Sequence, residues 1–190
     1  MHPTHKLVIL DRDGVINHDS DQFIKSPTEW KPIEGSIEAI ARLNQAGYRV
    51  AVATNQSGIG RGLFDMATLS AINDKMVELV FRNGGRIDAV FFCPHTADQK
   101  CHCRKPQTGM FEEIAARFRT GLDGVPAVGD ALRDLQAAAK VGCVPLLVLT
   151  GKGKKTNDAG GLPRGTKVFA DLAEVSKYLA TEAALAKAAS

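Results

Sequence analysis

The chain has 190 residues, and its 44% hydrophobic and 24% charged residues are ordinary globular usage that argues against disorder. The net charge of +3 is mild, and no basic tract interleaved with aromatic residues occurs, so a nucleic-acid partner is not favoured. No apolar stretch is long enough to cross a bilayer, so we expect no membrane partner and a cytoplasmic location. The length allows a full core but is short for two independent domains, and we expect a single domain over residues 1–190.

Strands are predicted to alternate with helices along the chain. Short apolar runs predict strands at residues 7–10, 49–53, 87–92, 125–130, 146–149 and 167–170. Helical spacing of apolar residues predicts helices at 36–46, 69–80, 110–116, 131–141 and from 172 onward. This alternation predicts an α/β fold, with a Rossmann-like parallel sheet that carries helices on both faces.

The segments between these elements carry two further expectations. The predicted core elements leave little spare chain between residues 13 and 105, so we expect no large cap domain. Residues 151–165 hold several lysines and glycines but do not fit the G-x-x-x-x-G-K-[ST] pattern of a phosphate-binding loop. We therefore predict a solvated loop there.

The first predicted strand ends in two carboxylates, Asp11 and Asp13, which are followed by Gly14. In open α/β sheets, ligands bind just beyond the carboxyl ends of strands, so both side chains are expected to point into a site. Two carboxylates this close repel each other unless a cation lies between them, and Mg²⁺ takes oxygen ligands of this kind. Gly14 permits a sharp turn. A plain strand cap and turn is the alternative interpretation of this segment taken alone.

Three later segments also place polar side chains at the ends of predicted elements. Thr54 follows the strand at 49–53, Lys105 precedes the helix at 110–116, and Asp130 ends the strand at 125–130. Asp134 comes four residues after Asp130. Each is weak evidence alone, since a lysine is most often solvated, but their order along the chain is specific.

The ordered motifs D-x-D-G-V, T-N-Q, K-P and G-D-x-x-x-D resemble the signatures of the haloacid dehalogenase superfamily of phosphatases. The resemblance runs from about residue 7 to about residue 150. It implies that Asp11 attacks phosphorus to form an aspartyl-phosphate, and that Asp13 is the general acid and base. Thr54 and Lys105 would hold the phosphoryl oxygens.

The same resemblance implies a magnesium site. Its ligands would be the carboxylates of Asp11 and Asp130 and the backbone carbonyl of Asp13. Asp134 would lie behind these ligands rather than bind the ion.

Two paired-ligand hooks, Cys93-Pro94-His95 and Cys101-His102-Cys103, predict a zinc site. Side chains two residues apart can point the same way, so Cys93, His95, Cys101 and Cys103 can form a closed Cys₃His set, with His102 facing away. A closed set is structural. Disulfides or free thiols are the alternatives, and a cytosolic chain disfavours disulfides. Cys143 stands apart and is predicted to be a small buried residue.

This cysteine loop, together with the four motifs, resembles one branch of the superfamily, that of bacterial heptose bisphosphate and histidinol phosphate phosphatases. We favour the heptose enzyme and a role in heptose precursor synthesis for lipopolysaccharide or related glycans. Many histidinol phosphatases are fused to a dehydratase domain, whereas we expect a single domain here. The partner implied is a small phosphorylated sugar, and we expect a monomer. A zinc-loop interaction module is the non-enzyme alternative, and the intact motif carboxylates and lysine argue against it.

The sequence departs from the pattern of these relatives at two places. Relatives often carry Lys or Ser where Ala131 stands, and Gly-Tyr within the loop at residues 19–22. Arg104 is predicted to contact the second phosphate, because a guanidinium pairs with phosphate at two points. The full set of predicted substrate-binding residues is Asp19, Ser20, Asp21, Gln22, Thr54, Asn55, Gln56, Ser57, Arg61, Arg104 and Lys105.

Overall fold

The computed structural model describes residues 6–188. Its centre is one six-stranded sheet in the order β3-β2-β1-β4-β5-β6, and every neighbouring pair is parallel. The strands are β1 (Lys6–Leu10), β2 (Tyr48–Asn55), β3 (Ala89–Cys93), β4 (Pro126–Gly129), β5 (Val144–Val148) and β6 (Lys167–Phe169). The predicted parallel sheet is confirmed.

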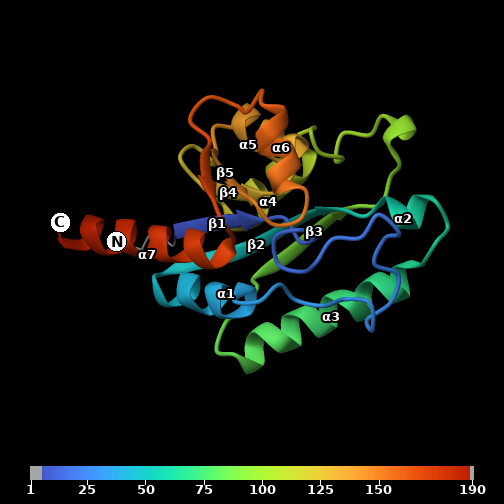
Figure 1. Cartoon of the computed structure of the whole chain (residues 1–190), viewed down its shortest axis with the longest axis horizontal. Coiled ribbons are helices and arrows are strands. Elements are labelled where there is room, and N and C mark those ends of the chain that lie inside the picture. Colours follow the sequence, from blue (N-terminus) through green and yellow to red (C-terminus); the bar gives the residue numbers. More distant parts are fainter. Residues whose placement is uncertain (1–5, 189–190) are drawn as a thin grey trace.

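The helices lie on both faces of this sheet (Figure 1). They are α1 (Ser36–Gln45), α2 (Ser57–Gly60), α3 (Met66–Arg82), α4 (Gly109–Phe118), α5 (Leu132–Lys140), α6 (Gly153–Ala159) and α7 (Leu172–Ala188), with a 3₁₀ turn at Ala97–Gln99. No helix within residues 6–188 is long and apolar enough to cross a membrane.

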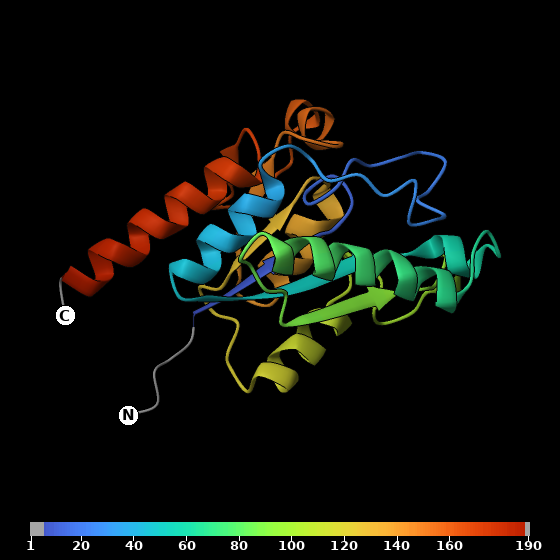
Figure 2. The ribbon, with the colours of Figure 1, turned by 90° about the horizontal axis from the view of Figure 1, so that it is seen from below.

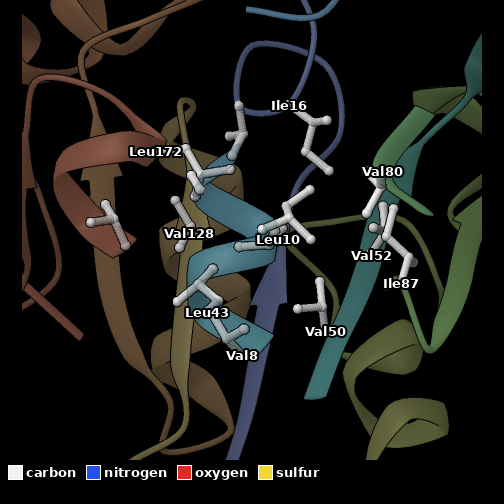
Figure 3. Packing of buried hydrophobic residues seen from close by; sticks show 14 of the residues in the cluster. Val8, Leu10, Ile16, Leu43, Val50, Val52, Val80, Ile87, Val128 and Leu172 are labelled. Carbon is white, nitrogen blue, oxygen red and sulfur yellow. The ribbon is translucent and has the colours of Figure 1, made fainter. Parts of the chain in front are cut away.

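Alternation along the central strand β1 builds two separate cores. Val8 and Leu10 pack with α1, α3 and α7, and this larger cluster is shown in Figure 3. Leu7 and Ile9 point to the opposite face and pack with α4 and α5. Figure 2 shows α1, α3 and α7 from their own side of the sheet. Because both faces of β1 are buried, its carboxyl end is held rigidly.

Two sequence expectations need correction. The segment 151–165 is not simply a solvated loop, because it contains α6, whose Gly153 is buried against β5. The strand expected at 49–53 extends through Asn55, since Thr54 and Asn55 continue the pairing with β3. Although residues 151–165 lack a phosphate-loop motif, part of this segment packs against the sheet through α6.

The strand order indicates that a ligand would bind beyond the carboxyl ends of β1 and β4. Chain connections run outward from β1 in both directions, toward β2 and β3 and toward β4, β5 and β6. In such sheets the crevice lies outside the carboxyl ends of the strands, where the strand order reverses. The backbone N–H of Asp11 donates to Val128 O of β4 at 2.9 Å, which ties β1 and β4 together at this point.

The core on the α1 side predicts a stability difference. Leu43 of α1 is fully buried, so Leu43→Ala should lower the free energy of unfolding by about 2–5 kcal/mol. Leu185 of α7 is 62% exposed, and Leu185→Ala should change it by less than about 0.5 kcal/mol. Urea unfolding curves of both variants provide the measurement, and equal losses would contradict this assignment of the core.

Candidate active site

Three carboxylates are buried together where β1 and β4 end. Asp11 directly follows β1, Asp130 directly follows β4, and Asp134 lies in the first turn of α5. All three are at most 6% exposed, and one oxygen from each lies within 4.8 Å of the others. Such a cluster cannot remain charged without nearby cations.

Lys105 supplies one of these positive charges. Its Nζ lies 3.1 Å from Asp11 Oδ1 and 2.8 Å from Asp134 Oδ1, and it donates to the backbone carbonyl of Ala53 at 2.8 Å. Burial opposes the charge on this 2% exposed side chain, but Asp11 and Asp134 outweigh that effect and raise the pKa of Lys105. Lys105 is therefore protonated and ion-paired within the cluster.

The backbone of Lys105 is fixed as firmly as its side chain. Asn55 Nδ2 donates to Lys105 O, and Lys105 N donates to Asn55 Oδ1, both at 3.1 Å. These two bonds join the end of β2 to the segment that carries the lysine.

One lysine does not neutralise three carboxylates. Burial raises the pKa of Asp11 to about 6, and Lys105 opposes this shift. Burial, with repulsion from Asp11 and Asp134, raises the pKa of Asp130 to about 8. By contrast, Lys105 and Arg133 outweigh the effect of burial and lower the pKa of Asp134. The Asp11 and Asp130 side of the cluster thus suits an additional hard cation such as Mg²⁺.

Two glycines make room for the Asp130 carboxylate. A Cβ on Gly14 would lie 2.1 Å from Asp130 Oδ2, and one on Gly151 would lie 2.2 Å from the same atom. Both glycines have positive φ, of 84° and 55°. Lys152 N donates to Asp130 Oδ2 at 2.7 Å, and Thr156 Oγ1 donates to Asp130 O at 2.8 Å. The chain after β5 therefore orients this carboxylate.

Asp13 belongs to a different network from Asp11. Its carboxylate accepts hydrogen bonds from Arg12, Asn17 and Gln56, and its side chain is 20% exposed. Gln56 Nε2 also donates to Thr54 Oγ1 at 2.9 Å. Two neighbouring carboxylates thus have separate sets of partners, and one of them is open to the adjoining pocket.

That pocket is a cavity of about 250 Å³ above the carboxylates. It is lined by Asp11, Asp13, Asp19, Ser20, Asp21, Phe23, Ile24, Thr54, Asn55, Gln56, Ser57, Arg61, Arg104, Arg133 and Lys152. Lys105 lies beneath it, bonded to Asp11. The structure thereby brings together almost all of the residues that the sequence predicted for substrate binding.

Gln22 is the exception. The backbone N–H of Phe23 bonds to Ser20 O, and Phe23 has a φ of 63°, so the chain turns sharply at this point. Gln22 is exposed and lines a neighbouring hollow instead of the pocket. Gln22 therefore stands apart from the other predicted substrate-binding residues, and its contact with substrate stays a prediction.

Sequence reasoning missed two cationic residues of the pocket. Lys152 pairs with Asp19 at 3.1 Å and with Asp21 at 3.6 Å, which ties the loop after β1 to the loop after β5. Within residues 6–188, the buried Nε of Arg133 in α5 has no hydrogen-bond partner. A buried donor of this kind is a place where a ligand oxygen can bind. The available signal was the position of Arg133 inside the G-D-x-x-x-D motif.

The predicted zinc ligands also converge. The sulfur atoms of Cys93, Cys101 and Cys103 are 3.1–3.6 Å apart, and His95 Nδ1 lies 3.6 Å from Cys93 Sγ and 3.3 Å from Cys103 Sγ. Tetrahedral Zn²⁺ with Zn–S bonds of about 2.3 Å would separate sulfur ligands by roughly 3.8 Å. The four donors therefore fit a single zinc ion with little movement.

Other cysteine and histidine side chains stay outside this cluster. His102 is 69% exposed and its Nε2 lies 2.8 Å from Glu112 Oε2, so it does face away. Cys143 is buried in the core beside α5, as predicted. Arg104 Nη1 donates to His95 O at 3.1 Å. The residue next to Lys105 is thus bonded directly to the cysteine loop.

Comparison with known proteins agrees with this geometry. Residues 102–175 match the hydrolase-like family described as HAD-hydrolase-like. A D-glycero-β-D-manno-heptose-1,7-bisphosphate 7-phosphatase of Bordetella bronchiseptica is 60% identical, over 94% of this chain and 99% of that protein. The enzyme of the same name from Neisseria meningitidis serogroup A is 54% identical, over 96% and 99%. The fold and site therefore define a phosphatase of the haloacid dehalogenase class.

A solved structure narrows the relationship. The Bordetella bronchiseptica D,D-heptose 1,7-bisphosphate phosphatase, complexed with magnesium and phosphate, superposes with a TM-score of 0.92 over 93% of this chain and 99% of that one, at 60% identity. The chain belongs to the family of D-glycero-β-D-manno-heptose-1,7-bisphosphate 7-phosphatases.

The crowding around Asp130 predicts a metal-binding defect. In Gly151→Ala, the new methyl group would collide with Asp130 Oδ2 and with Gly14 Cα, so the carboxylate must move. The Mg²⁺ concentration that gives half-maximal phosphatase activity should rise about 10-fold or more. Gly161→Ala is the matched control, because Gly161 also has a positive φ, of 71°, and among the described residues nothing lies within 4 Å of its new methyl group. An unchanged Mg²⁺ requirement in Gly151→Ala would contradict the role of this contact.

Proposed function

We propose that the chain removes the 7-phosphate of D-glycero-D-manno-heptose 1,7-bisphosphate in a Mg²⁺-dependent reaction. The observation that carries this proposal is the buried Asp11 carboxylate, paired with Lys105 at the floor of a pocket lined by several arginines. The 60% identical relative of that name, with coverage of nearly both chains, supports the substrate. The product would enter heptose precursor synthesis for lipopolysaccharide or related glycans. The enzyme would act in the cytoplasm as a monomer.

Asp11 is the proposed nucleophile. One of its oxygens attacks phosphorus, the bond from phosphorus to the sugar oxygen breaks, and an aspartyl-phosphate forms. Lys105 keeps Asp11 charged, because the ion pair favours the carboxylate over the acid. Burial of the pair keeps the carboxylate poorly hydrated and in a fixed orientation.

Asp13 is the proposed acid and base. It gives a proton to the departing sugar oxygen and later takes one from the water that hydrolyses the aspartyl-phosphate. Its partial exposure to the pocket suits both transfers. Asp11 cannot serve as this acid, because its carboxylate becomes phosphorylated, as an acyl phosphate, in the first step.

The remaining polar groups of the pocket fit a doubly anionic substrate. Thr54, Asn55 and Lys105 would hold oxygens of the transferred group. Arg104 is placed at the cysteine loop, where it would contact the second phosphate with a two-point bond. Asp19, Ser20, Asp21, Gln56, Ser57 and Arg61 line the walls on which the sugar would lie.

The carboxylate cluster fits magnesium. The carboxylates of Asp11 and Asp130, with the backbone carbonyl of Asp13, would hold the ion, and Asp134 is engaged by Lys105 and by the N–H of Ala131. Bound Mg²⁺ supplies electrostatic shielding between the anionic nucleophile and the anionic phosphate. The close approach of the buried carboxylates, with oxygens of Asp11, Asp130 and Asp134 within 4.8 Å of one another, supports this site, and burial raises the pKa of Asp11 and Asp130 in the same sense.

The cysteine cluster fits structural zinc. All four protein donors would be used, which leaves no position for a reacting water. The ion would order the loop that carries Arg104 and Lys105, so zinc would contribute to activity through the position of these two cations.

Histidinol phosphate is the alternative substrate within the same branch. Rates of phosphate release from heptose 1,7-bisphosphate and from histidinol phosphate, each with Mg²⁺, test the choice. A kcat/KM at least about 100-fold higher on the heptose substrate is expected. A preference for histidinol phosphate would overturn the proposed substrate, and no release from any phosphate ester would favour an interaction module instead.

Replacement of the nucleophile gives a sharp prediction. Asp11→Asn keeps the shape of the side chain but removes its charge, so phosphate release should fall by roughly 10³-fold or more. Thermal unfolding and zinc content should resemble those of the wild type. A variant with more than about a tenth of wild-type activity would contradict the proposed attack by Asp11.

The zinc loop gives a second prediction. Cys101→Ser removes one of four ligands, so bound zinc, measured by elemental analysis, should drop below about half an ion per chain, and activity should fall with it. Added Mg²⁺ should not restore the rate, because Asp11 and Asp130 lie on separate strand ends. Cys143→Ala, which changes a cysteine outside the cluster, should keep its zinc. Rescue of Cys101→Ser by Mg²⁺ alone would refute the coupling.

A further inference from the structure

Arg12 is a buried charged residue to which the mechanism above gives no part. It stands between Asp11 and Asp13 in the sequence, and its side chain is fully buried. A buried guanidinium is costly unless it is paired and hydrogen-bonded. Its partners should therefore show what it contributes.

The guanidinium of Arg12 forms a two-point hydrogen bond with the carboxylate of its neighbour Asp13. Nε donates to Asp13 Oδ1 and Nη2 donates to Asp13 Oδ2, both at 3.1 Å. The third nitrogen, Nη1, donates to Asn73 Oδ1 of α3 at 3.2 Å. A two-point bond fixes the plane of a carboxylate as well as its distance, and a lysine in this position could not do so.

Two amides complete the arrangement. Asn17 Nδ2 donates to Asp13 Oδ1 at 2.9 Å, and Gln56 Nε2 donates to Asp13 Oδ2 at 2.7 Å. Each Asp13 oxygen thus has one donor from Arg12 and one from an amide. Four donated hydrogen bonds thus fix the direction of the Asp13 carboxylate, and the bond from Arg12 to Asn73 is separate from them.

This arrangement also keeps the two reactive carboxylates apart. The Asp11 side chain is paired with Lys105, whereas the Asp13 carboxylate is bonded to Arg12, Asn17 and Gln56. Without Arg12, Asp13 would keep only one bond to each oxygen, from Asn17 and from Gln56, and the two-point bond that fixes the plane of its carboxylate would be lost.

We propose that Arg12 is a positioning residue that holds the Asp13 carboxylate in the orientation needed for proton transfer to the leaving oxygen. The proposal rests on the acid and base role of Asp13 in the proposed function. The Arg12 guanidinium acts only through Asp13, and the backbone N–H of Arg12, which a side-chain substitution leaves in place, donates separately to Asp11 Oδ1 at 2.8 Å. The competing view is that Arg12 serves only to bind α3 through Asn73.

A double-mutant cycle on kcat/KM tests the proposal, with Arg12→Met, Asp13→Asn and the double variant, in saturating Mg²⁺. Aryl phosphates with leaving groups of increasing pKa are the substrates, so the test does not depend on the heptose. Arg12→Met should lose about 10- to 100-fold on phenyl phosphate and less than about 5-fold on 4-nitrophenyl phosphate, because only the poorer leaving group needs a well-placed acid. In the Asp13→Asn background, Arg12→Met should cost less than about 3-fold more.

Three further variants separate positioning from folding. Arg12→Lys keeps the charge but loses the two-point grip, so it should fold and should show the same dependence on the leaving group. Asn73→Ala removes only the contact with α3 and should stay within about 3-fold of wild type on both substrates. Arg49→Met, which breaks the ion pair with Asp88 near the amino end of β2, is the control for loss of an arginine.

The outcomes are distinct. Equal losses on both aryl phosphates, or losses that multiply in the double variant, would overturn the proposal in favour of a purely structural Arg12. If Arg12→Met does not fold, Arg12→Lys decides between the same two results. A wild-type enzyme that hydrolyses aryl phosphates but not heptose 1,7-bisphosphate would defeat the proposed substrate and leave the result for Arg12 standing.

Discussion

Lys105 lies between two buried carboxylates, Asp11 and Asp134, at 3.1 and 2.8 Å. Much of the site is arranged around this ion-paired group. These ion pairs form only if Lys105 is held where three chain segments meet, and a buried charge without its partner is strongly destabilising. Asn55 holds the lysine backbone, Ala53 accepts from its Nζ, and the cysteine loop precedes it in the chain.

The sheet explains why these groups can meet. The carboxyl ends of parallel strands lie at the same end of the sheet. Three residues distant in sequence therefore converge there: Asp11 after β1, Thr54 near the end of β2 and Asp130 after β4. The loops then adjust the cluster. Gly14 and Gly151 pack closely against Asp130, which allows the carboxylates to approach one another. The bond from Arg104 to His95 O joins the residue before Lys105 to the cysteine loop.

Sequence patterns predicted the frame of this site well and its details less well. Asp11, Asp130 and Lys105 were predictable because each stands at a strand end or before a helix in an ordered set of motifs. The contact of Lys152 with Asp130 was not predictable, because it depends on how the chain after β5 packs against the turn at Gly14. The turn at Phe23 that directs Gln22 outward is likewise a matter of local backbone conformation, which residue types alone do not reveal.

The central claim is that Asp11, held charged by Lys105, receives the phosphoryl group. The most direct measurement is mass spectrometry of the Asp13→Asn variant, quenched in acid during turnover of an activated aryl phosphate, since loss of the base should slow hydrolysis of the intermediate. The account predicts one added phosphoryl group on the peptide that contains Asp11, and none when Asp11 is also changed to Asn. Phosphate on another residue, or turnover with water attacking the substrate directly and no protein adduct, would contradict it.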